Sequence, residues 1–305
     1  ILPTEYSYSF IMQYTKNRTV KPLKNNNLYF IKTTIEKATG THTNTDPEII
    51  TFPSNYHLFK MNDDGFSSIT KTSGGFQYSV SSDFGENWTE SLTIPADTLT
   101  NRLADIGFNN ISVLNYFDNH EAHIDNNGGL HVFTGLNLQS DTDDTTCYFH
   151  FYNSTPENVN AWIINYVTDI TQSYQYSFGE SGSGQSSSEF LFPAISFSYE
   201  NDNIIWFLCN KVSIIDANGD YTDLDIYLYK SENLGVSWID FGNITNTNSD
   251  NQIETYIHAA DNSTNNSIGF MYQIPDLDVN TLGGNFYADF KQLVYFGFYG
   301  DFVAG

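Results

Sequence analysis

Short apolar runs, separated by clusters of Asn, Asp, Gly and Ser, recur along most of this chain. Runs of this kind are typical of β-strands joined by tight turns. They predict strands at Leu28–Thr33, Leu130–Thr134, Cys147–Tyr152, Ala161–Val167, Ile204–Leu208, Ile226–Tyr229, Ile268–Tyr272 and Leu293–Tyr299. The run Ile204–Leu208 is apolar at every position, which indicates a strand buried on both faces between stacked sheets.

One segment has a helical pattern instead. Pro95 precedes Ala96 to Asp105, in which Leu99, Leu103 and the following Ile106 recur at helical spacing. Pro is favoured at the start of a helix, and apolar residues three or four apart share one helix face. The sequence therefore predicts an almost entirely β protein with a single helix.

The predicted hairpins also repeat at long range. Ala122, Ala194 and Ala259 each precede a turn and an apolar strand, and they lie 72 and 65 residues apart. A poorer copy starts near Asn55. A period of this size, with four strands per unit, predicts a β-propeller of four-stranded antiparallel blades. We expect five blades, with six as the alternative, in one domain over residues 1–305, where residues 1–54 form a further blade that closes the ring.

Two segments share the pattern Ser-x-Asp-x-Gly-x-x-Trp, the second with Asn in place of Asp. The pattern residues are Ser81, Asp83, Gly85 and Trp88 in the first box, and Ser231, Asn233, Gly235 and Trp238 in the second box. Ser and Asp side chains hydrogen-bond nearby backbone groups, Gly adopts conformations that other residues resist, and Trp packs under the turn. These residues are expected to lock hairpins, with both Trp rings mostly buried.

The two boxes resemble those of the sialidase-like (BNR/Asp-box) superfamily of β-propellers. The resemblance implies a propeller in which each box joins the outer two strands of a blade, away from the face that binds ligands. The segment from Asp223 to Thr245 also resembles a blade of extracellular propellers exported by the type IX secretion route. This resemblance specifies the fold much better than the activity.

The net charge of the chain narrows the classes of partner that it can bind. The chain has 12 Lys and Arg against 36 Asp and Glu, a formal charge of −24. Nucleic acid and anionic membranes are therefore excluded, because both need cationic side chains to neutralise phosphates, and no apolar run is long enough for insertion into a membrane. The surplus of carboxylates is consistent with calcium, cationic partners or simple solubility. Cys147 and Cys209 are expected to be buried thiols, with a single bridge between them as the alternative.

Sialidase activity is disfavoured by the sequence. The superfamily's sialidases hold the substrate carboxylate with three arginines, whose planar forks match a carboxylate in a bidentate way. This chain has two, Arg18 and Arg102. Glycoside hydrolysis by two carboxylates stays open, because 36 acidic residues make any pair uninformative from sequence alone.

Candidate ligand-binding residues come from the repeat. In propellers the loop that enters the innermost strand lies on the face that usually binds ligands, and aromatic and His side chains there suit a sugar or a peptide. The residues at or near the repeated alanines are His120, Glu121, His123, Tyr256, His258, Tyr56 and His57. His120 and His123 are too close in sequence for the H-E-x-x-H zinc motif, and on a strand they would point to opposite sides.

A candidate calcium site lies at Asp216, Asn218 and Asp220, which place an oxygen-bearing side chain at every second position. Calcium prefers such hard oxygen ligands. However, Gly219 comes fourth rather than sixth, and Tyr227 stands where an EF-hand has Glu. An acidic hairpin turn is the competing interpretation.

The sequence-based hypothesis for function is a non-catalytic binding or scaffold propeller, part of a larger exported or cell-surface protein. Its partner would be carbohydrate or protein at the cell surface. The alternative is a polysaccharide-active glycoside hydrolase or lyase acting at the central face. Both place the protein outside the cell.

Overall fold

The computed structural model describes residues 5–13, 28–36, 42–44, 48–50, 58–62, 64–71, 76–83, 85, 87–140, 144–171, 191–215, 221–247, 254–276 and 291–300. In these residues regular structure is almost entirely β-strand. The helix α1 (Ala96–Asp105) is the exception, and it lies where the sequence predicts it. Leu99 and Leu103 are buried, whereas Ile106, expected on the same face, is 36% exposed just beyond the helix end.

The strands form five antiparallel sheets in chain order, which we call blades 1 to 5. Blade 1 contains β1 (Glu5–Gln13), β2 (Leu28–Glu36), β3 (His42–Asn44) and β4 (Glu48–Ile50). Blade 2 contains β5 (Leu58–Met61), β6 (Ser67–Lys71), β7 (Gln77–Ser81) and β8 (Leu92–Thr93). Blade 3 contains β9 (Ile111–Ile124), β10 (Leu130–Ser140), β11 (Asp144–Asn153) and β12 (Ile163–Asp169).

The last two blades differ slightly from this arrangement. Blade 4 contains β13 (Ala194–Ser198), β14 (Ile205–Ile215), β15 (Tyr221–Ser231) and β16 (Ile239–Asn243), and β18 (Asn262–Ser263) joins β13 in parallel. Blade 5 contains β17 (Thr255–Ala259), β19 (Ser267–Asp276) and β20 (Lys291–Gly300). Every strand predicted from the apolar runs is present, mostly extended by several residues at one or both ends.

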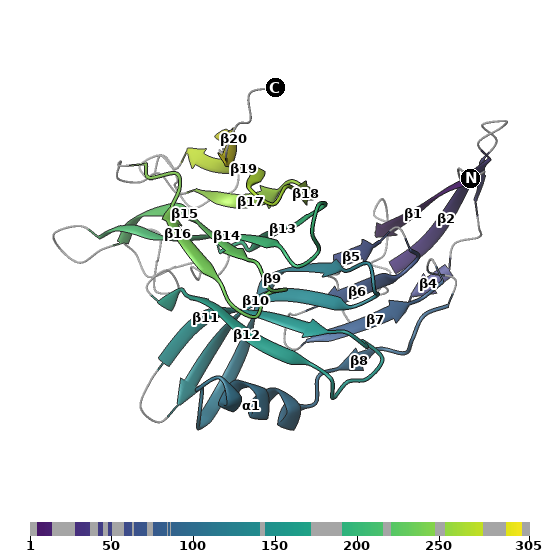
Figure 1. Ribbon diagram of the computed structural model, residues 1–305, viewed down its shortest axis with the longest axis horizontal. Coiled ribbons are helices and arrows are strands. Elements are labelled where there is room, and N and C mark those ends of the chain that lie inside the picture. The colour runs from purple at the N-terminus through teal and green to yellow at the C-terminus, as the bar shows by residue number, and fades with distance from the viewer. Residues whose placement is uncertain are drawn as a thin grey trace, which may run out of the picture.

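The fold is a β-propeller, as the repeat predicts. Figure 1 shows the sheets following one another, from blade 1 at the N-terminal side to blade 5 near the C-terminus. Strands β5, β9, β13 and β17 open their blades, and β9 lies between β5 and β13. Ala122, Ala194 and Ala259 fall on β9, β13 and β17, so the repeated alanines mark equivalent first strands. Closure of the ring by residues 1–54 stays a prediction.

Three hydrophobic cores lie between consecutive blades. The core between blades 2 and 3 holds the wholly buried Trp162, whose indole N–H donates to the Tyr78 hydroxyl over 3.2 Å. Along β14, Phe207 packs in the core toward blade 3 and Trp206 in the core toward blade 5. Successive residues of a strand point to opposite faces, so a continuously apolar strand fills both cores. This confirms the interpretation of the run Ile204–Leu208.

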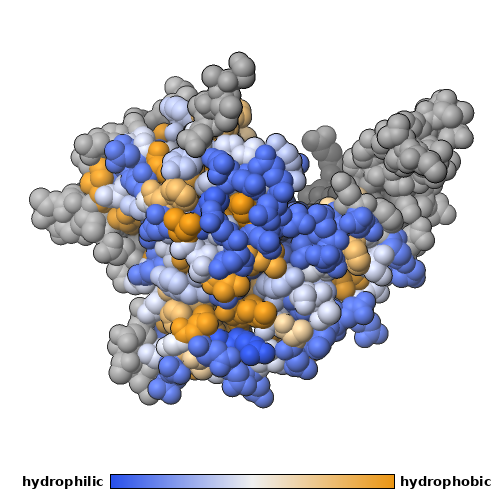
Figure 2. Space-filling model, viewed as in Figure 1, coloured by the Kyte–Doolittle hydropathy of each residue, from blue (hydrophilic) through white to orange (hydrophobic). Residues whose placement is uncertain are grey.

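Cys147 and Cys209 are both free and buried, as expected. They belong to different cores: Cys147 lies in the core between blades 2 and 3, and Cys209 in the core between blades 3 and 4. In the part of the chain that the structure describes, no helix has the length and hydrophobicity needed to cross a membrane. Figure 2 shows a face that is mostly hydrophilic, with hydrophobic side chains gathered in small separate patches.

Candidate functional site

Strand β9 carries three of the candidate residues and directs them to different neighbours. The imidazole of His120 hydrogen-bonds Thr70 of blade 2, with Nε2 and Oγ1 2.9 Å apart. His123 stacks on Phe197 of blade 4, with ring centroids 3.8 Å apart and an interplanar angle of 14°. The two histidines therefore point to opposite sides of the strand, as expected. Burial lowers the pKa of His123 to about 3, so its ring is neutral near pH 7.

Glu121 lies between these histidines and pairs with a cation from the neighbouring inner strand. Its Oε2 is 3.6 Å from Nζ of Lys60 on β5, and both side chains are partly exposed. Burial raises the pKa of the Glu121 carboxyl, and the charge of Asp261 beyond β17 raises it further, whereas Lys60 lowers it. A carboxyl group that keeps its proton longer than usual, in a partly exposed position, can serve as a general acid.

The candidates on β17 are arranged differently. Tyr256 has a positive φ of 50° and packs on Phe192, with ring centroids 4.6 Å apart. Positive φ is uncommon for a bulky residue and often marks a functional constraint. His258 is exposed. Tyr56 and His57 lie outside the described residues, and so does the candidate calcium site at Asp216, Asn218 and Asp220.

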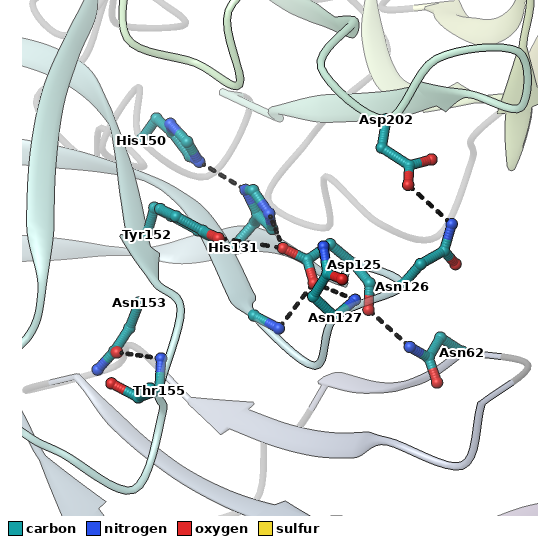
Figure 3. Close-up of polar contacts among 11 residues, drawn as sticks. Asn62, Asp125, Asn126, Asn127, His131, His150, Tyr152, Asn153, Thr155 and Asp202 are labelled. Carbon is teal, nitrogen blue, oxygen red and sulfur yellow. Dashed lines mark hydrogen bonds and ion pairs between the residues drawn. The ribbon is translucent and has the colours of Figure 1, made fainter.

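The hairpin between β9 and β10 holds a second polar arrangement, centred on Asp125 (Figure 3). Its Oδ1 accepts hydrogen bonds from the backbone N–H groups of Asn127 and Gly129, both at 2.8 Å. Its Oδ2 lies 3.2 Å from the Tyr152 hydroxyl and 3.3 Å from Nε2 of His131. Asp125 is only 4% exposed, so four donors replace the water that it loses on folding.

From His131 the contacts continue into the next blade. Nδ1 of His131 lies 2.9 Å from Nε2 of His150, and Nδ1 of His150 lies 3.3 Å from the carbonyl oxygen of Gly235. Both rings are fully buried, stacked at 7° to one another with centroids 5.1 Å apart. Gly235 is the glycine of the second box, so this line of contacts joins blade 3 to blade 4.

Neighbouring first hairpins are also tied directly to one another. Asn62 of blade 2 donates from its side chain to the backbone oxygen of Asp125 over 2.6 Å. Asn126 of blade 3 donates to Asp202 of blade 4 over 2.9 Å, as Figure 3 shows. The Asn and Asp residues that make these turns therefore also connect consecutive blades.

A third polar cluster lies between blades 4 and 5. Glu254 precedes β17 and is wholly buried, and its carboxylate accepts bonds from the Thr245 hydroxyl and from the backbone N–H of Ile226. The Thr247 hydroxyl lies 2.7 Å from Asp225 and 3.3 Å from Glu254, so it bridges two buried carboxyl groups. Burial raises the pKa of Glu254 to about 7, and the nearby charge of Asp225 adds to the effect.

The first box joins β7 and β8, the third and fourth strands of blade 2. The Ser81 hydroxyl donates to Asp83 over 2.8 Å and accepts from the backbone N–H of Gly85 over 2.8 Å. Gly85 has a φ of 79°, a conformation that favours glycine. The Trp88 indole N–H donates to the Gly85 carbonyl over 3.0 Å.

The second box joins β15 and β16, the equivalent strands of blade 4. Ser231 makes the same two bonds, to Asn233 over 3.0 Å and from Gly235 over 2.8 Å, and Gly235 has a φ of 81°. Trp238 packs edge-on against Phe133 of blade 3. The box geometry and its equivalent positions are therefore as expected.

Trp88 and Trp238 are each partly buried, in line with the expectation that both rings are mostly buried. The two rings differ from each other. Among the described residues the Trp238 indole nitrogen finds no hydrogen-bond partner, because the Gly235 carbonyl faces His150 instead.

The sequence did not identify Lys60, His131, His150 or Glu254 as site residues. His131 and His150 each interrupt a largely apolar run predicted to be a strand, and a histidine that is buried in such a strand needs polar partners. That signal could have singled out the pair. Glu254 lies outside every predicted strand, and the partners of its carboxyl group come from two other segments, so no local pattern pointed to it.

No family model matches this chain, and no curated protein matches it. Among solved structures it is similar to the β-fructofuranosidase catalytic domain of Microbacterium saccharophilum (10% identity, 77% of this chain and 58% of that chain, TM-score 0.44). It is also similar to an endo-arabinase of Bacteroides thetaiotaomicron (12% identity, 98% and 90%, TM-score 0.43) and to a sialidase of Streptococcus pneumoniae (13% identity, 80% and 32%, TM-score 0.38). The chain spans less than two thirds of the fructofuranosidase domain and of the sialidase.

These three proteins are enzymes: a β-fructofuranosidase, an endo-arabinase and a sialidase. On this finding, the expectation of a non-catalytic binding or scaffold module is corrected. The sequence-based argument rested on the lack of a local catalytic motif. In a propeller, residues around the axis come from strands that are far apart in sequence, as Lys60 and Glu121 are.

Proposed function

We propose that this chain is a carbohydrate-active enzyme, a glycoside hydrolase or a polysaccharide lyase, that acts around Glu121 at the inner strands. The main support is the ionic environment of Glu121. Its carboxyl lies on the first strand of blade 3, beside Lys60 and within the electrostatic reach of Asp261. Burial and the second carboxylate raise the pKa of Glu121, while that cation limits the shift.

The proposed chemistry assigns different roles to the two acids. Glycosidic bond cleavage needs one carboxylic acid to protonate the leaving oxygen and one carboxylate to act from the other side. Glu121 would be the acid, since its environment favours the protonated form. Asp261, which is exposed, would be the carboxylate. Lys60 would fix the orientation of Glu121, and His120, held by Thr70, would contact sugar hydroxyl groups.

The test is a panel of neutral and acidic polysaccharides, including fructan and arabinan, incubated with the purified chain. Reducing ends would report hydrolysis, and the ultraviolet absorbance of an unsaturated product would report a lyase. We expect Glu121→Gln to lower turnover by about 10²–10⁴-fold, the usual contribution of a general acid. Glu90→Gln, a change at an exposed carboxyl, is the matched control. Full activity of Glu121→Gln, or no product from any polysaccharide, would overturn the proposal.

Sialosides in the same panel are expected to stay intact. Arg18 lies outside the described residues, and Arg102 is engaged on α1, where it donates to the Trp162 carbonyl and pairs with Asp105. Two arginines cannot supply a three-arginine clamp for a carboxylate. Release of a fluorescent group from a sialoside would contradict this expectation.

We further propose that the chain belongs to the sialidase-like Asp-box propellers and works outside the cell or at its surface, exported by the type IX route. Its support is the paired boxes and the strongly acidic composition. Carbohydrate is the proposed partner. Fractionation of the producing cells, with an antibody to this chain, tests the location, and a purely cytoplasmic signal would end the proposal.

Calcium at Asp216, Asn218 and Asp220 also stays a proposal, supported by the alternating oxygen-bearing side chains. Calorimetry of metal-free protein is the test, with Asp216→Ala and Asp220→Ala as controls. Heat of binding that both variants abolish would support the site. No heat at about millimolar calcium, the weak end of extracellular sites, would exclude it.

A further inference from the structure

Asp125, His131, His150 and Gly235 are joined by more hydrogen-bonding contacts than the N–H groups of two neutral imidazoles can supply. There are three in succession: Asp125 to His131, His131 to His150, and His150 to the Gly235 carbonyl. The groups at both ends, a carboxylate and a carbonyl, can only accept. Each contact therefore needs a proton from a ring nitrogen.

The number of protons follows from the chemistry of imidazole. A neutral imidazole carries one N–H, so His131 and His150 together bring two protons to three contacts. If His131 donates to Asp125 and His150 donates to His131, then Nδ1 of His150 meets the Gly235 oxygen as lone pair against lone pair. The opposite arrangement moves the same conflict to Asp125. A third proton on the two histidine rings removes this conflict, because each of the three contacts then has one donor.

We propose that His131 and His150 share one extra proton near neutral pH, and that this proton latches the second box of blade 4 onto blade 3. The pair then carries one positive charge beside the Asp125 carboxylate. All three contacts have a donor, and the line is neutral overall. As pH rises, the proton leaves, one contact becomes repulsive, and the Gly235 turn is released from His150.

Two influences oppose each other at the pair. Burial lowers the pKa of both rings, whereas the Asp125 carboxylate raises that of His131. The contact that lacks a proton in the neutral pair also acts to raise the pKa of the pair, because a buried polar group without a partner costs more than an exposed one. Removal of the proton would also leave the charge of Asp125 without its cation in a buried position.

Among the residues that the structure describes, no other group compensates these charges. The titratable groups that face the pair are Tyr152 on β11, whose hydroxyl already donates to Asp125, and His123 on β9, whose ring is neutral. Apolar rings supply the remaining neighbours of the pair: Phe133 from blade 3, and Phe197 and Trp238 from blade 4.

The matched variant is Asp125→Asn. Its amide oxygen can still accept from the Asn127 and Gly129 backbone groups, while its NH₂ group donates to Nε2 of His131. His131 then donates to His150, and His150 donates to Gly235, so two neutral rings fill every contact. This variant needs no third proton, although it keeps the size and shape of the side chain.

The experiment is nitrogen NMR of the folded protein labelled with ¹⁵N in its histidine rings, titrated from about pH 6 to about pH 9. We expect three of the four ring nitrogens of His131 and His150 to be protonated near neutral pH, falling to two as pH rises. In Asp125→Asn we expect two throughout. Two protonated nitrogens in the wild-type protein at every pH would overturn the proposal, and so would three in the variant. The wild-type spectrum decides the count by itself, so the test holds even if the variant fails to fold.

Discussion

The hairpin of Asp125 and the junction around Glu254 each bury a carboxyl group almost completely, yet the two acids are shifted in opposite directions. Burial acts to raise the pKa of Asp125, but hydrogen bonds from His131, Gly129 and Asn127 together hold it below its usual value. Burial raises the pKa of Glu254 to about 7 against bonds from Thr245, Ile226 and Thr247. Burial alone therefore does not decide whether an acid is charged.

The difference lies in what each acid has beside it. Asp125 faces a ring that can be cationic and two backbone N–H groups fixed by a tight turn. Glu254 faces a second carboxyl, Asp225, across a shared Thr247 hydroxyl that has a single proton to give. Like charges at close range favour the neutral form of one partner. The first site therefore stabilises an anion, and the second stabilises a carboxylic acid.

The largest expected effect is at Asp125. Asp125→Ala removes the acceptor for two backbone N–H groups, the Tyr152 hydroxyl and His131, all of them buried or partly buried. We expect a loss of about 3–5 kcal/mol in the free energy of unfolding, measured with urea. Asp202→Ala, at an exposed acid that accepts one bond from Asn126, is the control and should cost less than about 1 kcal/mol. Equal losses in the two variants would mean that the Asp125 hydrogen bonds add nothing.

The second-largest expected effect concerns Glu254, whose pKa is shifted in the direction opposite to that of Asp125. An acid whose folded pKa lies above its unfolded value contributes most stability below the unfolded pKa and loses that contribution as pH rises through the folded pKa. For Glu254 the window runs from the ordinary pKa of 4.5 to a folded-state pKa of about 7. We expect the wild-type protein to lose about 2–3 kcal/mol over this window relative to Glu254→Gln.

The control for this measurement is Glu157→Gln, at an exposed carboxyl. Its pH profile should follow that of the wild-type protein. If Glu254→Gln also follows the wild-type profile, the carboxyl is ionised in the folded protein and the contrast with Asp125 is wrong.

Much of the scaffold that carries these sites could be predicted from sequence. The apolar runs gave the strands because pleated, half-buried surfaces select aromatic and β-branched residues. The repeated alanines located three first strands, since each packs where inner strands approach closely. The hydrogen bonds within both boxes could be expected because they are local, between Ser, Asp or Asn, and Gly within a single turn.

The chemistry could be predicted only in part. Glu121 was proposed as a site residue from its place beside a repeated alanine, but its partner Lys60 comes from another blade. The turn after Ala122, which contains Asp125, was expected from the repeat, whereas the contacts of Asp125 to His131 and Tyr152 depend on the register of strands β9 to β11. Glu254 and Asp225 meet only through packing of two blades. Contacts of this kind are set by tertiary structure, which a single sequence does not show.

The boxes allow a smaller comparison between blades 2 and 4. Trp238 packs against Phe133, Phe207 and His150, whereas Trp88 donates to its own turn at Gly85. Both rings are only partly buried, so replacement should cost less than the ~3–5 kcal/mol of a buried Trp. We expect about 2–3 kcal/mol for Trp238→Ala and about 1–2 kcal/mol for Trp88→Ala, measured by urea denaturation. A larger loss for Trp88→Ala would show that the first box carries more of the packing.

The smallest expected effect is at Asp83, an acid of the first box near the surface. Asp83 accepts from the backbone N–H and the side-chain amide of Asn87, at 2.8 and 2.6 Å. The second box has Asn233 at this position, and its oxygen accepts the equivalent backbone bond from Ser237 at 2.9 Å. An amide oxygen therefore suffices, and water screens the lost charge. Asp83→Asn should change the free energy of unfolding by less than about 1 kcal/mol. If Asp83→Asn lost as much stability as Asp125→Ala, the contribution of an acid in these turns would depend on its charge. It would then not depend on how deeply the acid is buried or on how many donors it accepts from.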